Sequence, residues 1–159
     1  MDPIYLSDDF KEFLRLLNSN EVEYVIVGGY AVAHHGHPRT TGDLDVWIAQ
    51  TEPNIARVVS ALKAFGFDVP QLTPDLFRGR DRIVRMGSPP VRIELLTQVS
   101  GLSFADSYGR ARPSDFDGVP VRVISLDDLR TNKRAAGRPK DLADLDALKD
   151  VIVDGGTDL

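Results

Sequence analysis

Cysteine is absent from this 159-residue sequence. Its absence excludes disulfide bonds, thiolate catalysis and cysteine-based zinc sites. Long apolar runs are missing too, since no stretch approaches the ~20 apolar residues that a membrane-spanning helix needs. The first ten residues, MDPIYLSDDF, contain no basic segment followed by an apolar run and so do not form a signal peptide. We therefore expect a cytoplasmic protein.

The composition is that of an ordinary globular domain, with 42% apolar and 27% charged residues. The length is sufficient for a substantial core, and we expect one domain over residues 1–159. The net charge of −5 argues against a surface that coats nucleic acid nonspecifically. An acidic total suits a metal-binding pocket and leaves room for a local basic site.

Residues 24–48 are the stretch around which the chain is organised. Tyr24–Val27 reads as a short buried strand, Gly28 and Gly29 as a turn, and residues 30–35 as a short helix. The glycines have two interpretations. They form either a tight turn that needs a positive φ, or a backbone that phosphate oxygens can approach beside the N–H groups of a helix N-terminus. Their position directly before a helix favours the second.

A second strand is predicted from Asp43 to Ala49, and its two aspartates are the main chemical signal. Asp43 and Asp45 stand two residues apart, so both carboxylates leave the same face of the strand. An exposed polar face is the simple alternative. However, Asp is depleted in strands, and like charges on one face repel unless a cation compensates them. Two rigid carboxylates supply the hard oxygen ligands of a divalent cation, which is the interpretation we favour.

A third carboxylate is expected from a later hairpin. Residues 81–87 and 91–97 read as its two strands, with Glu94 directed away from the apolar side chains of the second strand. Glu94 either forms an ordinary cross-strand ion pair, with Arg92 or Arg82, or completes an acidic cluster with the aspartates. In the second case it ligates a metal or acts as a base.

Two amphipathic helices are predicted as scaffold on either side of the central stretch. Ser7 is the expected N-cap of the first helix, and Thr51 caps a second that ends at Gly66. The apolar stripe of the first helix is expected to face the core: Phe10, Phe13, Leu14 and Leu17.

The last third of the chain is predicted to contain a long loop, a strand and a helical segment. Residues 98–118 are rich in Gly, Ser and Asp and read as the loop, and residues 119–125 as the strand. The C-terminal segment 126–151 is predicted to be helical, with a break at Gly137. Its last helix is expected to direct three leucines inward: Leu142, Leu145 and Leu148.

Polar residues occupy the end of the predicted short helix and the loop before Asp43. His34, His35 and His37 form a cluster, but no further ligand with a zinc-like spacing accompanies them, so we interpret them as packing residues. Arg39 and Thr41 belong either to a solvated loop or to a segment that positions the site and contacts phosphate.

The ordered set of these motifs resembles the polymerase-β-like nucleotidyltransferase superfamily, especially its small prokaryotic members. The resemblance rests on Gly28-Gly29, Arg39-Thr40-Thr41-Gly42-Asp43-Leu44-Asp45 and Glu94. Two departures stand out: relatives usually carry Asp at the position of Glu94, and many place a serine after the first glycine. The resemblance implies nucleotide-binding roles for Gly28, Gly29, Arg39 and Thr41.

The segment LRTNKRAAGRPKDLADLDAL is also similar to the C-terminal part of these small nucleotidyltransferases. The resemblance implies that Lys133 reaches the nucleotide phosphates, with Arg138 and Lys140 as weaker candidates. A solvated helix lysine is the alternative. The helical spacing of Arg130, Lys133 and Arg134 would place the three cations on one face.

The implied fold is α/β, with a small mixed sheet and helices packed mainly on one side. The implied reaction is transfer of a nucleoside monophosphate from an NTP to an acceptor hydroxyl on a tRNA end, a protein or a small molecule. Mg²⁺ or Mn²⁺ would be held by Asp43, Asp45 and Glu94, which would be the catalytic residues. Several small relatives are toxins of toxin–antitoxin pairs, so an antitoxin partner is a further expectation. The alternative is a non-catalytic module that binds a nucleotide or a partner; half of a two-chain enzyme is a third reading.

Overall fold

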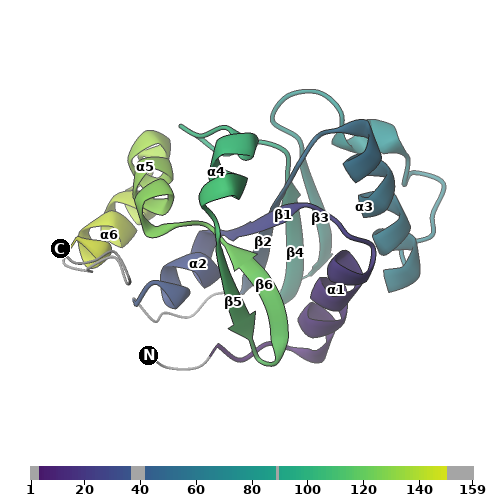
Figure 1. Cartoon of the computed structure of the whole chain (residues 1–159), viewed down its shortest axis with the longest axis horizontal. Helices are drawn as coiled ribbons and strands as arrows, with labels where there is room; N and C mark the ends of the chain where they lie inside the picture. The colour runs from purple at the N-terminus through teal and green to yellow at the C-terminus, as the bar shows by residue number, and fades with distance from the viewer. Residues whose placement is uncertain (1–3, 37–41, 89, 150–159) are drawn as a thin grey trace.

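The computed structural model describes residues 4–36, 42–88 and 90–149. Helices and strands alternate along the chain around one sheet (Figure 1). In chain order the elements are α1 (Asp8–Ser19), β1 (Tyr24–Val27), α2 (Gly28–His34), β2 (Asp43–Ile48), α3 (Glu52–Phe65), the 3₁₀ turn η1 (Pro74–Phe77), β3 (Ile83–Ser88), β4 (Val91–Leu96), α4 (Phe104–Arg110), β5 (Arg112–Phe116), β6 (Val119–Val123), α5 (Leu126–Ala136) and α6 (Pro139–Leu148).

The sheet is mixed, as the sequence predicts, and has six strands in the order β3-β4-β2-β1-β6-β5. The central strands β1 and β2 are antiparallel to each other. Each has a parallel outer neighbour, β6 beside β1 and β4 beside β2. Two hairpins, β3–β4 and β5–β6, complete the edges. The α3 crossover between β2 and β4 therefore brings two strands that are distant in sequence side by side.

Helices α1 and α3 pack together against one face of this sheet (Figure 1). Ser7 accepts a hydrogen bond from the backbone N–H of Phe10 and so caps α1, and Thr51 caps α3 in the same way through Asn54. The apolar stripe of α1 is buried along its whole length, as predicted. Leu44 of β2 is also fully buried. This face of the sheet is therefore filled by the core.

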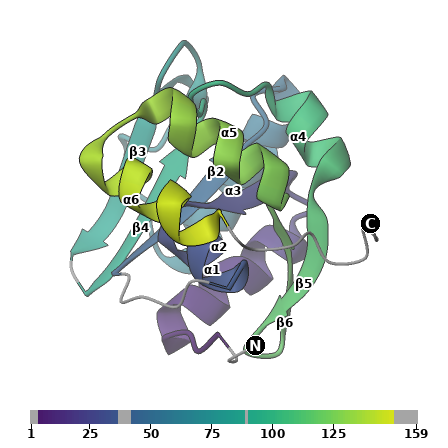
Figure 2. The same ribbon diagram turned by 90° about the vertical axis from the view of Figure 1, so that its left-hand side faces the viewer.

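The opposite side of the sheet is crossed by α5 and α6, which stand in front of the strands in Figure 2. Ser125 caps α5, and Gly137 ends it with a left-handed φ of 64°. The polar face of β2 thus looks toward the C-terminal helices, and the space between them holds the candidate site.

Two predictions for the last third of the chain are wrong. Residues 98–118 are not one long loop, because they contain α4 and β5, and β5 pairs with β6 along its whole length. Leu142 does not face inward and is 50% exposed. The inward positions of α6 are occupied by Asp141, Asp144 and Leu148. The acids can take these positions because a buried lysine of α5 pairs with them.

Over the described residues, no helix is both long enough and apolar enough to cross a membrane.

Candidate active site

The glycine turn at the end of β1 lies directly against an aspartate of β2. Gly28 has a φ of 70°, a left-handed conformation that L-residues with a side chain rarely adopt. A Cβ atom at this position would overlap the carboxylate of Asp45. Helix α2 begins at Gly28 itself, so the predicted turn is the first turn of the helix. Glycine is therefore required here both for the backbone angle and for the close approach of Asp45.

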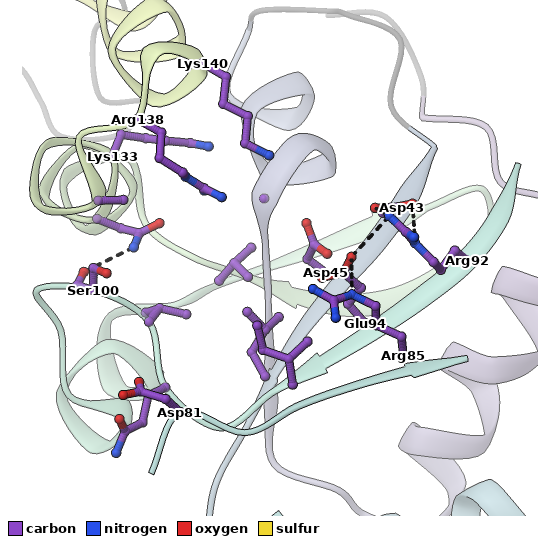
Figure 3. Close-up of a pocket in the computed structure, with 18 residues that line it drawn as sticks. Asp43, Asp45, Asp81, Arg85, Arg92, Glu94, Ser100, Lys133, Arg138 and Lys140 are labelled. Atoms are coloured by element: carbon purple, nitrogen blue, oxygen red, sulfur yellow. Dashed lines mark hydrogen bonds and ion pairs between the residues drawn. The ribbon is translucent and has the colours of Figure 1, made fainter. Parts of the chain in front are cut away.

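Three carboxylates come from neighbouring strands onto one face. Asp43 and Asp45 project from the same side of β2, opposite the buried Leu44. The parallel register of β2 and β4 sets Asp45 beside Glu94. Figure 3 shows these side chains converging on one cleft. The strand register thus brings together the three acidic residues that were predicted from the sequence as site residues.

Two arginines of the β3–β4 hairpin partly neutralise these acids. Arg92 donates to both oxygens of Asp43, at 3.2 and 2.8 Å, and its Nη2 lies 3.5 Å from Glu94. Arg85 reaches Glu94 at 3.4 Å from the paired strand. Of the two partners that we considered for Glu94, Arg92 does form an ion pair with it, but from the same strand, and the cross-strand partner is Arg85. Arg82 instead donates its Nε–H to the backbone carbonyl of Arg78.

The two aspartates have opposite electrostatic environments. Hydrogen bonds from Arg92 hold the pKa of the Asp43 carboxyl below its usual range. Burial, together with the negative charges of Glu94 and Asp43, raises the pKa of Asp45 to about 7. Asp45 is therefore the acid that gains most from an added positive charge, because its ionised form lacks the compensation that Asp43 receives.

The donor chemistry suits a hard divalent cation, since the cluster offers only carboxylate oxygens on a rigid sheet. Within the described part of the chain, however, no three acidic or histidine side chains stand together as a ready set of metal ligands. The guanidinium of Arg92 contacts both Asp43 and Glu94, at 2.8 and 3.5 Å. A cation bound by Asp43 would compete with the contact between Arg92 and Asp43.

Lys133 of α5 lies at the opposite wall of the cleft and is almost completely buried. Its side chain is 4% exposed, and its Nζ lies 3.3 Å from Asp141 and 3.1 Å from Asp144 of α6. The predicted basic face of α5 is not a common surface. Arg130 donates to the carbonyl of Leu148, and Arg134 is exposed to solvent. Lys133 thus joins α5 to α6 in addition to lining the cleft.

Arg138 and Lys140, at the start of α6, bring further positive charge to the same cleft. The Nε of Arg138 donates to Asp141 at 2.6 Å, and its Nη2 donates to the other oxygen of that carboxylate at 3.1 Å. Burial would raise the pKa of Asp141, but the hydrogen bonds from Arg138 and Lys133 lower it overall. One ionised carboxylate therefore fixes both Lys133 and Arg138. Figure 3 shows the lysines and Arg138 across the cleft from the acidic cluster.

The cleft between these walls has a volume of about 600 Å³. The sheet contributes the carboxylates together with Arg85 and Arg92, and the C-terminal helices contribute the cations Lys133, Arg138 and Lys140. A polyphosphate with a bound divalent cation carries the matching pair of charges, negative phosphates and a positive ion. The cleft is also large enough to hold a small-molecule ligand.

The remaining predicted residues lie elsewhere. Gly29 is buried in the first turn of α2. Arg39, Thr41 and His37 fall outside the described residues. The Nε2 of His35 lies 2.7 Å from the backbone carbonyl oxygen of Ile124. Burial, and to a smaller extent the neighbouring His35, lowers the pKa of His34 to about 4. Both histidines are half-buried packing residues, as expected.

Comparison with known proteins gives a consistent picture. Residues 6–159 match the family described as "Nucleotidyl transferase of unknown function (DUF2204)". Among solved structures, a candidate nucleotidyltransferase from Thermotoga maritima superimposes with a TM-score of 0.57 at 15% identity, covering 88% of each chain. An antigenic nucleotidyltransferase-like protein from Paracoccidioides brasiliensis gives 0.52 at 19% identity, covering 91% of this chain and 76% of that one. At these identities the likeness concerns the fold. No curated protein sequence matches the chain.

Proposed function

The chain belongs to this family of nucleotidyl transferases, and on that premise we propose that it transfers a nucleoside monophosphate from an NTP to an acceptor hydroxyl, releasing pyrophosphate. The observation that carries the proposal is the register of β2 and β4. It sets Asp45 beside Glu94, on the strand face that also holds Asp43, and turns this face toward three cations across the cleft.

The residues that would hold the divalent cation, Mg²⁺ or Mn²⁺, are Asp43, Asp45 and Glu94. When bound, such an ion neutralises phosphate charge and lowers the pKa of the attacking hydroxyl. Asp45 supports this role because its carboxylate is buried beside two other acids. An ion held by Asp43 would compete with Arg92, whose guanidinium could then stay with Glu94 or bind a phosphate oxygen.

The protein side chains position the nucleotide. Arg138 and Lys140 offer donors to the triphosphate from the start of α6, with Lys133 beside them in the cleft wall. Gly28 leaves room for the Asp45 carboxylate at the end of β1, and Gly29 follows it in the first helical turn. Both glycines are proposed to offer backbone N–H groups to the phosphates. Arg39 and Thr41 are proposed to contact the nucleotide from the segment before β2. Glu94 either ligates the ion or accepts the proton of the acceptor hydroxyl.

The acceptor is proposed to be a tRNA end, a protein side chain or a small molecule. The resemblance to toxin-type nucleotidyltransferases makes a toxin role, with a cognate antitoxin as partner, the biological setting that we propose.

The ion pair between Arg92 and Asp43 favours one alternative, a module that binds nucleotide without turnover. The guanidinium of Arg92 donates to both carboxylate oxygens of Asp43, a proposed metal ligand. In that case the cleft would bind a nucleotide through its cations alone, and divalent cations would not be needed.

The deciding experiment incubates the protein with each α-labelled NTP, Mg²⁺, and total RNA, total protein or small hydroxyl acceptors. We expect label transfer that requires the metal. Glu94→Gln should keep nucleotide binding and lower turnover by about 10²–10⁴, the usual contribution of a positioned base. Glu94→Asp should retain substantial activity, and Glu12→Gln, on the exposed side of α1, should behave as wild type. Metal-independent nucleotide binding without transfer to any acceptor would establish the binding module instead.

A further inference from the structure

Along the cleft, the side chains on one face of the β3–β4 hairpin change from charged to apolar to polar. Cross-strand partners on this face begin with Arg85 opposite Glu94 at the acidic cluster. The next pair is Ile83 opposite Leu96, two residues further along each strand. All four side chains line the cleft. Because a strand rises about 3.3 Å per residue, the apolar pair lies about 7 Å from the charged one.

The hairpin continues for one more pair beyond its regular strands. The backbone N–H of Thr97 donates to the carbonyl of Arg82 at 3.0 Å, and the Thr97 hydroxyl accepts from the N–H of Arg82 at 2.9 Å. Asp81 and Gln98 lie next to this pair along the chain, and both line the cleft. Figure 3 places Asp81 toward the far end of the cleft from Asp43. A polar pair thus follows the apolar one.

The apolar pair presents its side chains to the cleft. Ile83 is 46% exposed, an unusual position for a large apolar side chain of a strand, and Val99 continues this surface. Helix α5 forms the other side through Ala136 and Asn132, and Asn132 donates to the carbonyl of Ser100 at 3.1 Å. The space between the hairpin and α5 therefore has an apolar wall and polar groups at its rim, as sites for planar ligands do.

We infer that this end of the cleft binds the nucleobase, with Ile83 and Leu96 against its face and Asp81 and Gln98 reading its edge. The inference rests on the proposed function, because the phosphates are taken to lie at the acidic cluster and the cations. From there, a nucleoside extends along the hairpin past the apolar pair, so that its base edge meets the polar pair.

The two polar side chains define which bases fit. An ionised aspartate can only accept hydrogen bonds, whereas a glutamine amide both donates and accepts. Together they match an exocyclic amine that donates beside a ring nitrogen that accepts, the arrangement found in cytosine and adenine. Uracil and hypoxanthine present a carbonyl in place of the amine, and a carbonyl opposite the Asp81 carboxylate leaves two acceptors facing each other. The site therefore selects CTP and ATP over UTP and ITP.

The test measures equilibrium binding of CTP, UTP, ATP and ITP in the presence of Mg²⁺. Each pair differs at one exocyclic group. We expect CTP over UTP, and ATP over ITP, by about tenfold or more, the worth of one well-placed base contact. Asp81→Asn should abolish or invert both preferences, because the new amide can donate to a carbonyl. Asp81 has a φ of 52°, which asparagine adopts readily, so this substitution preserves the backbone. Asp68→Asn, an exposed aspartate away from the cleft, is the matched control.

Three results would overturn the inference, and they separate it from the proposed function. Equal binding of all four nucleotides removes the base site but leaves the nucleotidyl transferase reaction intact. Preferences that persist unchanged in Asp81→Asn assign the base elsewhere in the cleft. Binding of none of the four nucleotides overturns both the base site and the proposed function.

Discussion

Gly28 and Asp45 are in such close contact that no side chain fits between them: a Cβ on residue 28 would overlap Oδ2 of the aspartate. The glycine that ends β1 and the central acid of β2 are therefore one structural unit. The backbone of Gly28 therefore limits how deeply the Asp45 carboxylate can be buried.

Gly28→Ala tests this dependence. We expect it to push the Asp45 carboxylate away from its place and to weaken divalent cation binding at least tenfold. The left-handed φ adds a conformational cost of about 1 kcal/mol. Gly118→Ala is the control, because Gly118 also has a positive φ of 88° but no atom within 4 Å of the added Cβ. Isothermal titration with Mn²⁺ and urea unfolding separate the two effects; equal cation affinity in both variants would contradict the contact.

Asp45→Asn should stabilise the metal-free protein in a pH-dependent way. The carboxyl pKa is raised from 3.8 to about 7 in the folded protein, so between these values the folded state binds more protons than the unfolded state. In the wild type, the Asp45 carboxyl therefore contributes to the free energy of unfolding below pH 4. That contribution is lost as the pH rises to 7. The variant escapes that loss, and we expect it to be about 1–3 kcal/mol more stable at pH 8 and no more stable at pH 4.

Urea unfolding across this pH range measures the difference, with Asp68→Asn as a control that should track wild type. Divalent cation should reverse the order at pH 8, because only the wild-type carboxylate gains stability from the ion. A pH-independent difference between Asp45→Asn and wild type would show that the carboxyl titrates normally.

Arg92→Gln removes the guanidinium that contacts both Asp43 and Glu94. In the absence of nucleotide we expect tighter Mn²⁺ binding by severalfold, because the ion no longer competes with an arginine for Asp43. The metal-free protein should lose little stability at neutral pH, since the pair is partly exposed to solvent and screened by it. Arg80→Gln, an exposed arginine near the same hairpin, serves as the control. Weaker cation binding in Arg92→Gln would mean that Arg92 supports the metal site.

Lys133→Met should destabilise the protein by about 3 kcal/mol, because Asp141 and Asp144 would be left without their buried partner. Arg134 is the next residue along the chain and is exposed, so Arg134→Met is the control. Substitutions at such surface positions usually change the free energy of unfolding by less than about 0.5 kcal/mol, which is close to the error of the measurement. If Lys133 also binds phosphate, the variant should lose affinity for triphosphate more than for nucleoside. Thermal unfolding and nucleotide titration report the two roles separately, and an unchanged melting temperature would disprove the structural one.

The sequence was most informative where a pattern repeats and least where tertiary partners decide. Period-two alternation placed Asp43, Asp45 and Glu94 on one side of their strands, because the geometry of a strand is local. Which strands are neighbours is not local, yet the order of motifs was sufficient to predict that the three acids meet. The pairing of Arg92 with Asp43 was missed, since it depends on the register between β2 and β4.

Two errors have physical explanations. The segment that forms β5 contains Pro113 and Asp115, which disfavour strands, and it is held by pairing with β6. In α6, leucines at helical spacing suggested the buried face, but Leu142 is exposed while Asp141 and Asp144 are buried. Burial of an acid is favourable only with a partner, and the partner Lys133 lies on another helix.

The parallel pairing of β2 with β4 delays the assembly of the acidic cluster during folding. Asp43 and Arg92, which face each other across this pairing, are separated by 49 residues. Contacts between such distant residues form late, because closing the intervening chain is entropically costly. The cationic wall follows later still during synthesis, since its last member is Lys140. A chain growing on the ribosome therefore exposes its carboxylates before the cationic side of the cleft exists, and we expect the proposed activity only after the C-terminal helices have emerged.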